Sequence, residues 1–415
     1  MSPGPVKLIR ACPPWVLRLA LFLVVAIGVY LRIQRLDDNP SRSPDERMYV
    51  ELASRLAHDG PFATQALFRN FVANPILWDY PSPNRSGFLL PLAAAMRLAG
   101  RYDFSVAAAV SVMASILTLL LAVGLAIRHF GLTAALGTAV VMCSSVVELG
   151  LASRAWQDSL FCLLNLLLFG LAAEIIRQPR RNALYIAYHA AGAWCLLTKP
   201  SAPVLYALCS VGLAVLLIRR EGSLRRAMAI LVGGPVAILT AFAVWSVLGG
   251  GTGLALQVLI HSLQPGPGAW EYSRLCCSGP AWQLSWVMVL ISPLAALLAT
   301  VGLRDVWRNK GSIGWIAAFV LLGFLAFLSL YRDLQSVRYL SPVHGIYCLL
   351  VGIGLTAVGK WAAISLPRES RLALFVLLGA IAPVVIARDY RVFESIKATG
   401  AQDFGAVQVR EILSR

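Results

Sequence analysis

Long apolar runs recur along this sequence of 415 residues, and they limit its possible folds more than any other feature. Examples are residues 15–30, 104–127 and 315–330. A membrane hydrocarbon core of about 30 Å is crossed by roughly 20 helical residues at about 1.5 Å each, and runs of this length suit it. Because many such runs are present, the sequence predicts an all-α polytopic membrane protein built as a helical bundle.

Composition supports a membrane protein and argues against a nucleic-acid partner. Only 13% of the residues are charged, whereas a soluble domain has about 25%. The net charge of +16 comes mainly from arginines in short loops, where membrane orientation requires them. No basic patch with interleaved aromatic residues accompanies this charge, so we expect membrane lipids and no nucleic acid as partners.

The apolar runs predict about 11 transmembrane helices. Their expected ranges are 15–31, 104–127, 132–150, 159–176, 183–198, 201–218, 228–248, 282–303, 313–331, 339–359 and 371–387. Residues 87–99 are apolar but too short to span, so an interfacial or re-entrant helix is expected there.

We therefore expect one transmembrane domain over residues 1–387, followed by a short extracytoplasmic tail, 388–415. Within the domain, the first outside loop, 32–86, is expected to contain interfacial helices. The Gly- and Pro-rich segment 249–281 is expected to be a flexible cover loop.

Loop charges predict the orientation of the helices. If residues 87–99 do not cross, most loop arginines and lysines fall on the side of the N-terminus. The positive-inside rule then predicts a cytoplasmic N-terminus and a periplasmic C-terminus, in what we expect to be a bacterial inner membrane. The long loop 32–86 is also rich in arginine, and these side chains would face anionic lipid or an anionic ligand.

Two adjacent acids, Asp45 and Glu46, are the first candidates for chemistry. A carboxylate at the membrane surface can accept the proton of an acceptor hydroxyl that attacks a sugar. The alternative is structural: Ser43, Pro44 and Glu46 match a capping box with proline at the first helical position. An amphipathic helix ending at Gly60 would follow and lie along the membrane surface.

Asp158 is a second candidate acid, at the expected outer end of a helix. It either forms an ion pair with Arg154 or caps the next helix, or it binds an acceptor. It could also share a divalent metal with Asp45, although no ligand spacing indicates a metal site.

Lys199 and Arg338 are candidate cations on the same predicted side as the acids. Lys199 either extends toward water from a helix end or neutralises a phosphate. Arg338, followed by Tyr339, either marks the membrane interface or holds a phosphate through its planar fork. Each residue alone favours the structural explanation.

The order of these short motifs resembles a known family. They are listed here as they stand in the chain: Ser43-Pro44-Asp45-Glu46, Ser153-Arg154-Ala155-Trp156-Gln157-Asp158, Leu197-Thr198-Lys199-Pro200 and Arg338-Tyr339-Leu340. The series resembles the GT-C glycosyltransferases, and within them the superfamily of dolichyl-phosphate-mannose protein mannosyltransferases and aminoarabinose transferases. The likeness runs from about residue 15 to 360.

This resemblance implies an inverting transfer of a sugar from a polyprenyl phosphate to an acceptor outside the cytoplasm, in the cell envelope. It assigns Asp45 as the catalytic base, with Glu46 beside it, and Asp158 as the second acid. Lys199 and Arg338 occupy positions suited to the donor phosphate.

The chain departs from the family at residues 80–87, where a His- or Lys-Pro-Pro motif is usual. Arg85 would replace that cation. A lipid or glycan acceptor is favoured over a protein, because no large soluble domain follows the last expected span. The alternative function is a transporter or flippase of a lipid or lipid-linked sugar. The sequence, however, has no evident repeat, and its notable charges lie at helix ends.

Overall fold

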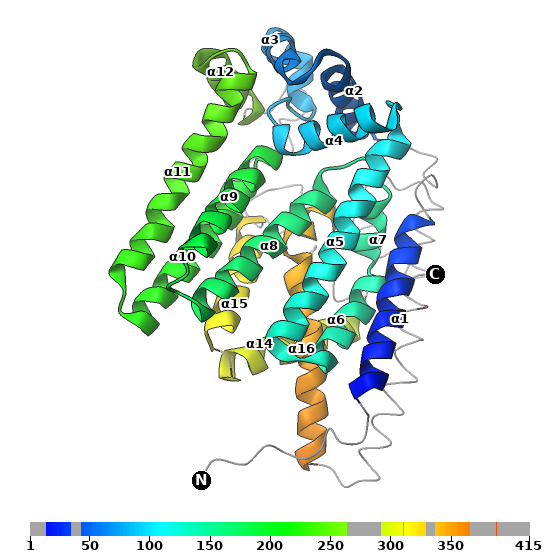
Figure 1. Cartoon of the computed structure of the whole chain (residues 1–415), viewed down its shortest axis with the longest axis vertical. Helices are drawn as coiled ribbons and strands as arrows, with labels where there is room; N and C mark the ends of the chain where they lie inside the picture. Colours follow the sequence, from blue (N-terminus) through cyan, green and yellow to red (C-terminus); the bar gives the residue numbers. More distant parts are fainter. Residues whose placement is uncertain are drawn as a thin grey trace.

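The computed structural model describes residues 14–34, 43–263, 292–309, 311–328, 337–365 and 387 (Figure 1). Every regular element in these ranges is a helix, which confirms the predicted all-α class. The expected span 371–387 and the tail 388–415 lie outside the described residues, apart from residue 387, as do residues 282–291 of another expected span.

The described chain is an integral membrane protein. Six helices are long and apolar enough to cross a bilayer: α1 (Pro14–Ile33), α5 (Phe104–Phe130), α8 (Asp158–Arg177), α10 (Ala202–Glu221), α11 (Leu224–Leu248) and α16 (Ser341–Ser365). Shorter helices pack among them: α6 (Leu132–Ser144), α7 (Val146–Ala152), α9 (Asn182–Thr198), α14 (Pro293–Asn309) and α15 (Gly311–Leu328).

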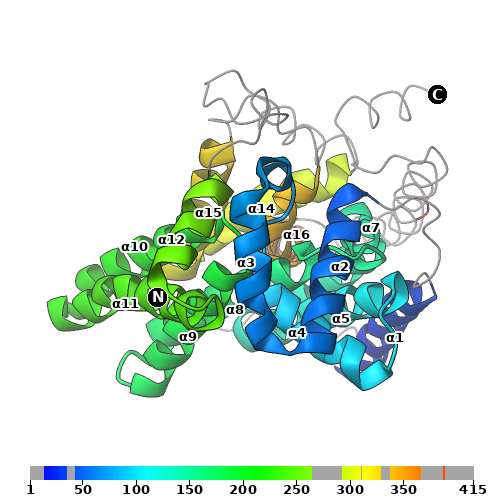
Figure 2. The same cartoon turned by 90° about the horizontal axis from the view of Figure 1, so that it is seen from above.

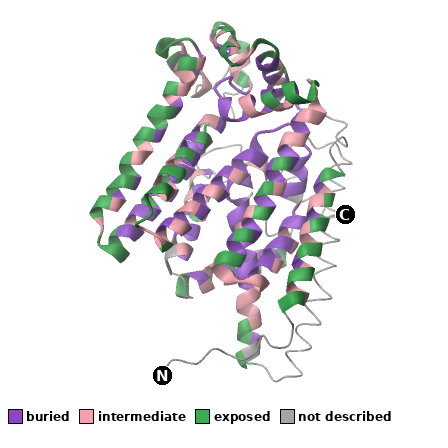
Figure 3. Cartoon of the chain, in the orientation of Figure 1, coloured by how far each residue is buried: buried purple, intermediate pink, exposed green. Residues whose placement is uncertain are grey.

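Burial distinguishes central from peripheral helices (Figure 3). In α8 and in the span that includes α16, 72% of the apolar window is buried, against 17% in α1 and 22% in α11. The outer helices instead expose large apolar side chains such as Phe22, Ile27 and Leu239. In a bilayer these side chains face lipid, so α8 and α16 form the centre of the bundle.

Four helices cover one end of the bundle, which we term the capped end (Figures 1 and 2). They are α2 (Pro44–Asp59), α3 (Thr64–Ala73), α4 (Ser86–Ala99) and α12 (Thr252–Leu263), joined in part by the short 3-10 turns Pro61–Ala63 and Pro75–Asp79. A third 3-10 turn, Val337–Leu340, leads into α16.

Helix α2 begins and ends as predicted, but its apolar face has a different partner. The face that carries Tyr49, Leu52 and Leu56 is buried inside the protein, where α2 packs on α4. We had expected this face to rest on the membrane surface. Helix α4 is apolar and, at 14 residues, shorter than a span, in agreement with its prediction as a non-crossing helix.

Two other expectations need correction. The expected single helix 132–150 is two helices, because the chain becomes extended at Ser145, whose hydroxyl accepts a hydrogen bond from the backbone N–H of Glu148. The expected flexible cover 249–281 contains α12, which packs on α3 through Phe68, Phe71 and Val258. His261 of α12 also stacks on Trp78 in the turn Pro75–Asp79, with ring centres 4.0 Å apart.

The ends of α5 and α8, with Arg128 and Arg177, lie at the end opposite the capped end. Arg128, near the end of α5, donates to Glu174, near the end of α8, over 2.8 Å. Both helices therefore finish at the same end. Asp158 begins α8 and so lies at the other end, toward α2 and α4.

Candidate functional site

Asp45 and Arg338 form an ion pair at the capped end. Asp45 lies in the first turn of α2, and Arg338 lies in the turn before α16; their side chains approach to 3.2 Å. The Asp45 side chain is 30% exposed and that of Arg338 17%, the most open of the ion pairs among the candidate residues. A ligand entering from this end can therefore reach Asp45.

Glu46 is wholly buried and holds three elements together. Its side chain accepts from the backbone N–H of Ser43 (2.8 Å), which completes the predicted capping box with Pro44 at the first helical position. The same carboxylate accepts from the backbone N–H of Ala155 (2.8 Å) and pairs with Arg154 (2.7 Å). These contacts join the start of α2 to residues 153–157, which we call the site turn.

Asp158 pairs with Lys199 at 2.5 Å, and both side chains are almost fully buried. Of the alternatives for Asp158, the ion pair with Arg154 is not the one that forms, because Arg154 pairs with Glu46. Lys199 follows α9 and has extended backbone angles (φ −147°, ψ 139°), as expected for a residue before proline. This conformation directs the chain from α9 into α10 beside the start of α8.

Two aromatic rings lie among these charges. The guanidinium groups of Arg154 and Arg338 lie 4.4 Å and 4.9 Å from the ring centre of Trp156. Arg338 and Lys199 lie 5.3 Å and 5.6 Å from the ring centre of Tyr339. A cation near an aromatic face is attracted by the ring quadrupole, so the two rings stabilise the cations beside them.

Tyr49 belongs to a buried polar cluster beside the ion pairs. Arg85 donates to its hydroxyl oxygen. Burial is the main cause that raises the pKa of Tyr49 far above 10, and the carboxylates of Asp45 and Asp158 add to the rise. The phenol therefore keeps its proton at neutral pH. Gln157 completes the cluster, since its correctly oriented amide donates to the carbonyl of Thr198 (2.6 Å) and accepts from Arg85 (2.9 Å).

A close approach between α4 and α9 sets the position of this cluster. The carbonyl of Gly87 accepts a hydrogen bond from the indole of Trp194 (2.9 Å). A Cβ atom on Gly87 would lie 2.5 Å from the hydroxyl of Thr198 and 2.9 Å from the backbone of Leu197. Only glycine allows α4 to approach the end of α9, immediately before Lys199.

The charge arrangement does not fit a divalent metal. Each acid of the site already faces an arginine or a lysine, at distances from 2.5 to 3.2 Å. An added dication would be repelled by these neighbouring cations. No group of three or more His, Cys, Asp or Glu side chains in the described part of the chain is placed to hold a metal ion.

The fold thus brings together every site residue predicted from the sequence. Arg85, Lys199 and Arg338 come from segments far apart in the chain, and all lie beside an acid or a polar group of the same end. Trp156, Gln157 and the hydroxyl of Tyr49 were missed as members of the site. Trp156 and Gln157 could have been predicted as site residues, because they directly precede Asp158 in the sequence.

Comparison of sequences identifies no relative of this chain. No protein-family model matches it, and no characterised protein matches it by sequence.

Comparison of structures does identify the fold. ArnT from Cupriavidus metallidurans bound to undecaprenyl phosphate matches with a TM-score of 0.62 and 17% identity, over 97% of this chain and 75% of that one. The oligosaccharyltransferase AglB from Archaeoglobus fulgidus, in complex with an inhibitory peptide and a dolichol-phosphate, matches with a TM-score of 0.59 and 12% identity. That match covers 94% of this chain and 56% of AglB. Both are GT-C glycosyltransferases, so this chain has the GT-C fold.

Proposed function

We propose that this GT-C-fold protein is an inverting glycosyltransferase that moves a sugar from a polyprenyl-phosphate donor to an acceptor at the extracytoplasmic face of the membrane. The acceptor is a lipid, a glycan or a protein. The polyprenyl phosphates bound by ArnT and AglB support this class of donor.

One observation carries the proposal: Asp45 is a partly exposed carboxylate, held in place by Arg338, at the end of the bundle where the other site residues gather. A base must be fixed yet open to the hydroxyl that it deprotonates. Asp158 and Glu46 are almost fully buried in their ion pairs, so Asp45 is the acid best placed to act as the base.

In the proposed reaction, Asp45 is the base and the polyprenyl phosphate is the leaving group. The acceptor hydroxyl oxygen attacks the anomeric carbon of the donor sugar, and its proton passes to Asp45. The bond between this carbon and the phosphate oxygen breaks, and its electron pair leaves on the polyprenyl phosphate. Attack from the face opposite the phosphate inverts the configuration at the anomeric carbon.

The cations of the site suit a leaving phosphate. Four cations, Arg85, Arg154, Lys199 and Arg338, accompany three acids in this cluster. Arg85 is the surplus cation, because within the described ranges it contacts Tyr49 and Gln157 but pairs with no carboxylate. Positive charge fixed where negative charge develops lowers the barrier to departure of the phosphate. In this proposal Lys199, Arg338 and Arg85 bind the donor phosphate, with Tyr339 beside them, and Asp158 orients the acceptor.

Mass spectrometry of cell-envelope lipids and glycans tests the proposal. We would compare a strain that lacks the gene with the same strain carrying the wild type or Asp45→Asn. Loss of a mass the size of one sugar in both the deletion and the variant is the expected result. Loss in the deletion alone would reject Asp45 as the base. No change in any glycan, with ligand flux in proteoliposomes, would favour a transporter or flippase.

A further inference from the structure

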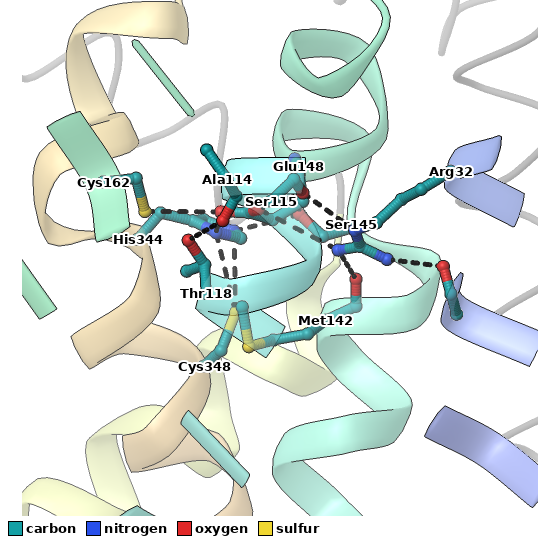
Figure 4. A network of polar contacts seen from close by, with 11 residues as sticks. Arg32, Ala114, Ser115, Thr118, Met142, Ser145, Glu148, Cys162, His344 and Cys348 are labelled. Carbon is teal, nitrogen blue, oxygen red and sulfur yellow. Dashed lines mark hydrogen bonds and ion pairs between the residues drawn. The ribbon is translucent and has the colours of Figure 1, made fainter. Parts of the chain in front are cut away.

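A second group of charged residues lies inside the bundle, separate from the candidate site. Figure 4 shows Glu148 of α7 between Arg32 of α1 and His344 of α16. All three side chains are at least 96% buried. Charged groups inside a membrane protein are expensive and usually serve a function, so this network requires an explanation.

The carboxylate of Glu148 is fully satisfied. It accepts hydrogen bonds from the hydroxyl of Ser115 (3.0 Å) and the thiol of Cys162 (3.4 Å). Arg32 lies 3.9 Å away and balances its charge, and Nδ1 of His344 lies at 3.3 Å. These contacts join α1, α5, α7, α8 and α16 at one point.

Both ring nitrogens of His344 have partners in this network. The hydroxyl of Ser145 accepts from the backbone N–H of Glu148 (3.3 Å), so its own proton can be donated to Nε2 of His344 at 3.0 Å. Nδ1 then carries the proton and donates to Glu148. A protonated imidazole would donate to the same two partners, so His344 joins Glu148 to Ser145 in either form.

Arg32 reaches this network because α1 packs closely on α6. Its guanidinium donates to the carbonyls of Gly28 (2.9 Å) and Met142 (3.0 Å), and its Nε donates to Ser115 (2.8 Å). A Cβ on Gly28 would meet the sulfur of Cys143 at 2.3 Å, so glycine is required at this contact. Arg32 therefore places a positive charge beside Glu148 from the peripheral helix α1.

The place of the network in the chain connects it to the site. Glu148 lies on the short helix α7, which ends at Ala152, directly before the site turn with Arg154 and Trp156. His344 lies in the first turn of α16, directly after Val337–Leu340 with Arg338. The contact between Glu148 and His344 thus joins α7 to α16. The chain after α7 carries Trp156, and the turn before α16 carries Arg338.

We propose that Glu148 and His344 are positioning residues of the transferase, which fix the site turn relative to Val337–Leu340 and so hold Arg338 between Trp156 and Asp45. Neither residue touches the candidate site itself. The expected loss of turnover rests on the proposed function. The expected change in hydrogen exchange does not.

His344→Leu is the sharpest test, because it removes the link between α7 and α16 without leaving Arg32 or Glu148 unpaired. His344→Asn is the conservative variant, since its amide can donate from near the Nδ1 position. His129→Leu is the matched control: His129 is also largely buried and lies 3.2 Å from an acid, Glu174, but at the opposite end of the bundle.

Two measurements follow for each variant in detergent. Hydrogen exchange by mass spectrometry should be faster in peptides that cover the site turn and residues 337–341 of His344→Leu. Turnover should fall roughly ten- to a hundredfold, with the KM for the acceptor within about twofold, because misplaced groups cost rate. His344→Asn should recover most of both properties, and His129→Leu should match the wild type.

The proposal would be overturned by unchanged exchange in both segments of His344→Leu, or by faster exchange spread evenly over α5, α8 and α16. Equal effects of His129→Leu would also reject it. If the wild type transfers no sugar to any acceptor, the proposed function fails, while the exchange measurement still decides whether the network positions these segments.

Discussion

Arg338 and Asp45, which are 293 positions apart in the sequence, meet at 3.2 Å at the capped end of the bundle. Arg338 also lies near the rings of Trp156 and Tyr339, so a single guanidinium contacts the candidate base, the site turn and its own neighbour. The position of Asp45 is therefore set by α16 as well as by α2. Substitution of Arg338 should therefore change the position of Asp45.

Arg338→Gln should lower sugar transfer about ten- to a hundredfold, because it removes a cation that orients Asp45 and faces the phosphate. Asp45→Asn should lower the rate of sugar transfer about 10²- to 10⁴-fold, because it removes the general base. If the two act as a unit, the double variant should be little worse than Asp45→Asn alone. Kinetics with purified enzymes measure this, and strictly multiplicative losses would contradict a shared role.

Glu46→Gln should act mainly on stability. The change leaves Arg154 facing a neutral amide in a buried position, which costs roughly 3 kcal/mol or more. Thermal unfolding in detergent measures the loss. Glu51→Gln is the matched control on the same helix, since Glu51 is exposed and pairs with the exposed Arg55, and should change little. Unchanged unfolding together with lost transfer would instead make Glu46 a reacting group.

The buried pair of Lys199 and Asp158 should show strong coupling. Lys199→Met leaves the carboxylate of Asp158 without its cation and should destabilise the protein more than Asp158→Asn/Lys199→Met does. A coupling free energy of about 0.5–3 kcal/mol is expected from a double-mutant cycle of unfolding measurements. Additive effects of the two single changes would mean that the 2.5 Å contact does not form in the membrane protein.

Gly87→Ala should separate α4 from the end of α9. Because the added Cβ would meet the Leu197 backbone, the helices must shift, at a cost of about 1–3 kcal/mol. Transfer should fall as Lys199 moves. Gly124→Ala on α5 is the control, because a Cβ there has no atom within 4 Å, and it should preserve or slightly increase the unfolding temperature. Equal behaviour of the two variants would contradict the close approach.

Chelation should leave the reaction intact. Since each site carboxylate already has a cationic partner, sugar transfer should keep its rate after treatment with EDTA and removal of free metal. Rates of treated and untreated enzyme measure this directly. A loss that Mg²⁺ or Mn²⁺ restores would show that a metal displaces one of these ion pairs during the reaction.

Sequence by itself determined the membrane class, most helix positions and the side on which the candidate residues gather. Those properties follow from local signals: apolar length, a capping box at Ser43, and the alternation of ends along consecutive spans. Helix α2 illustrates the limit. Its start and its end at Gly60 were predictable, but whether its apolar face met lipid or α4 was not, because both surfaces are apolar.

Tertiary structure alone decided the pairings. Arg154 had two acids within reach, Glu46 and Asp158, and the site turn gave it the first while Lys199 took the second. The network of Arg32, Glu148 and His344 could not be predicted either, because the three residues lie in separate segments and no local pattern connects them. Ion pairs between distant segments depend on helix packing in three dimensions, and spacing along one chain does not record that packing.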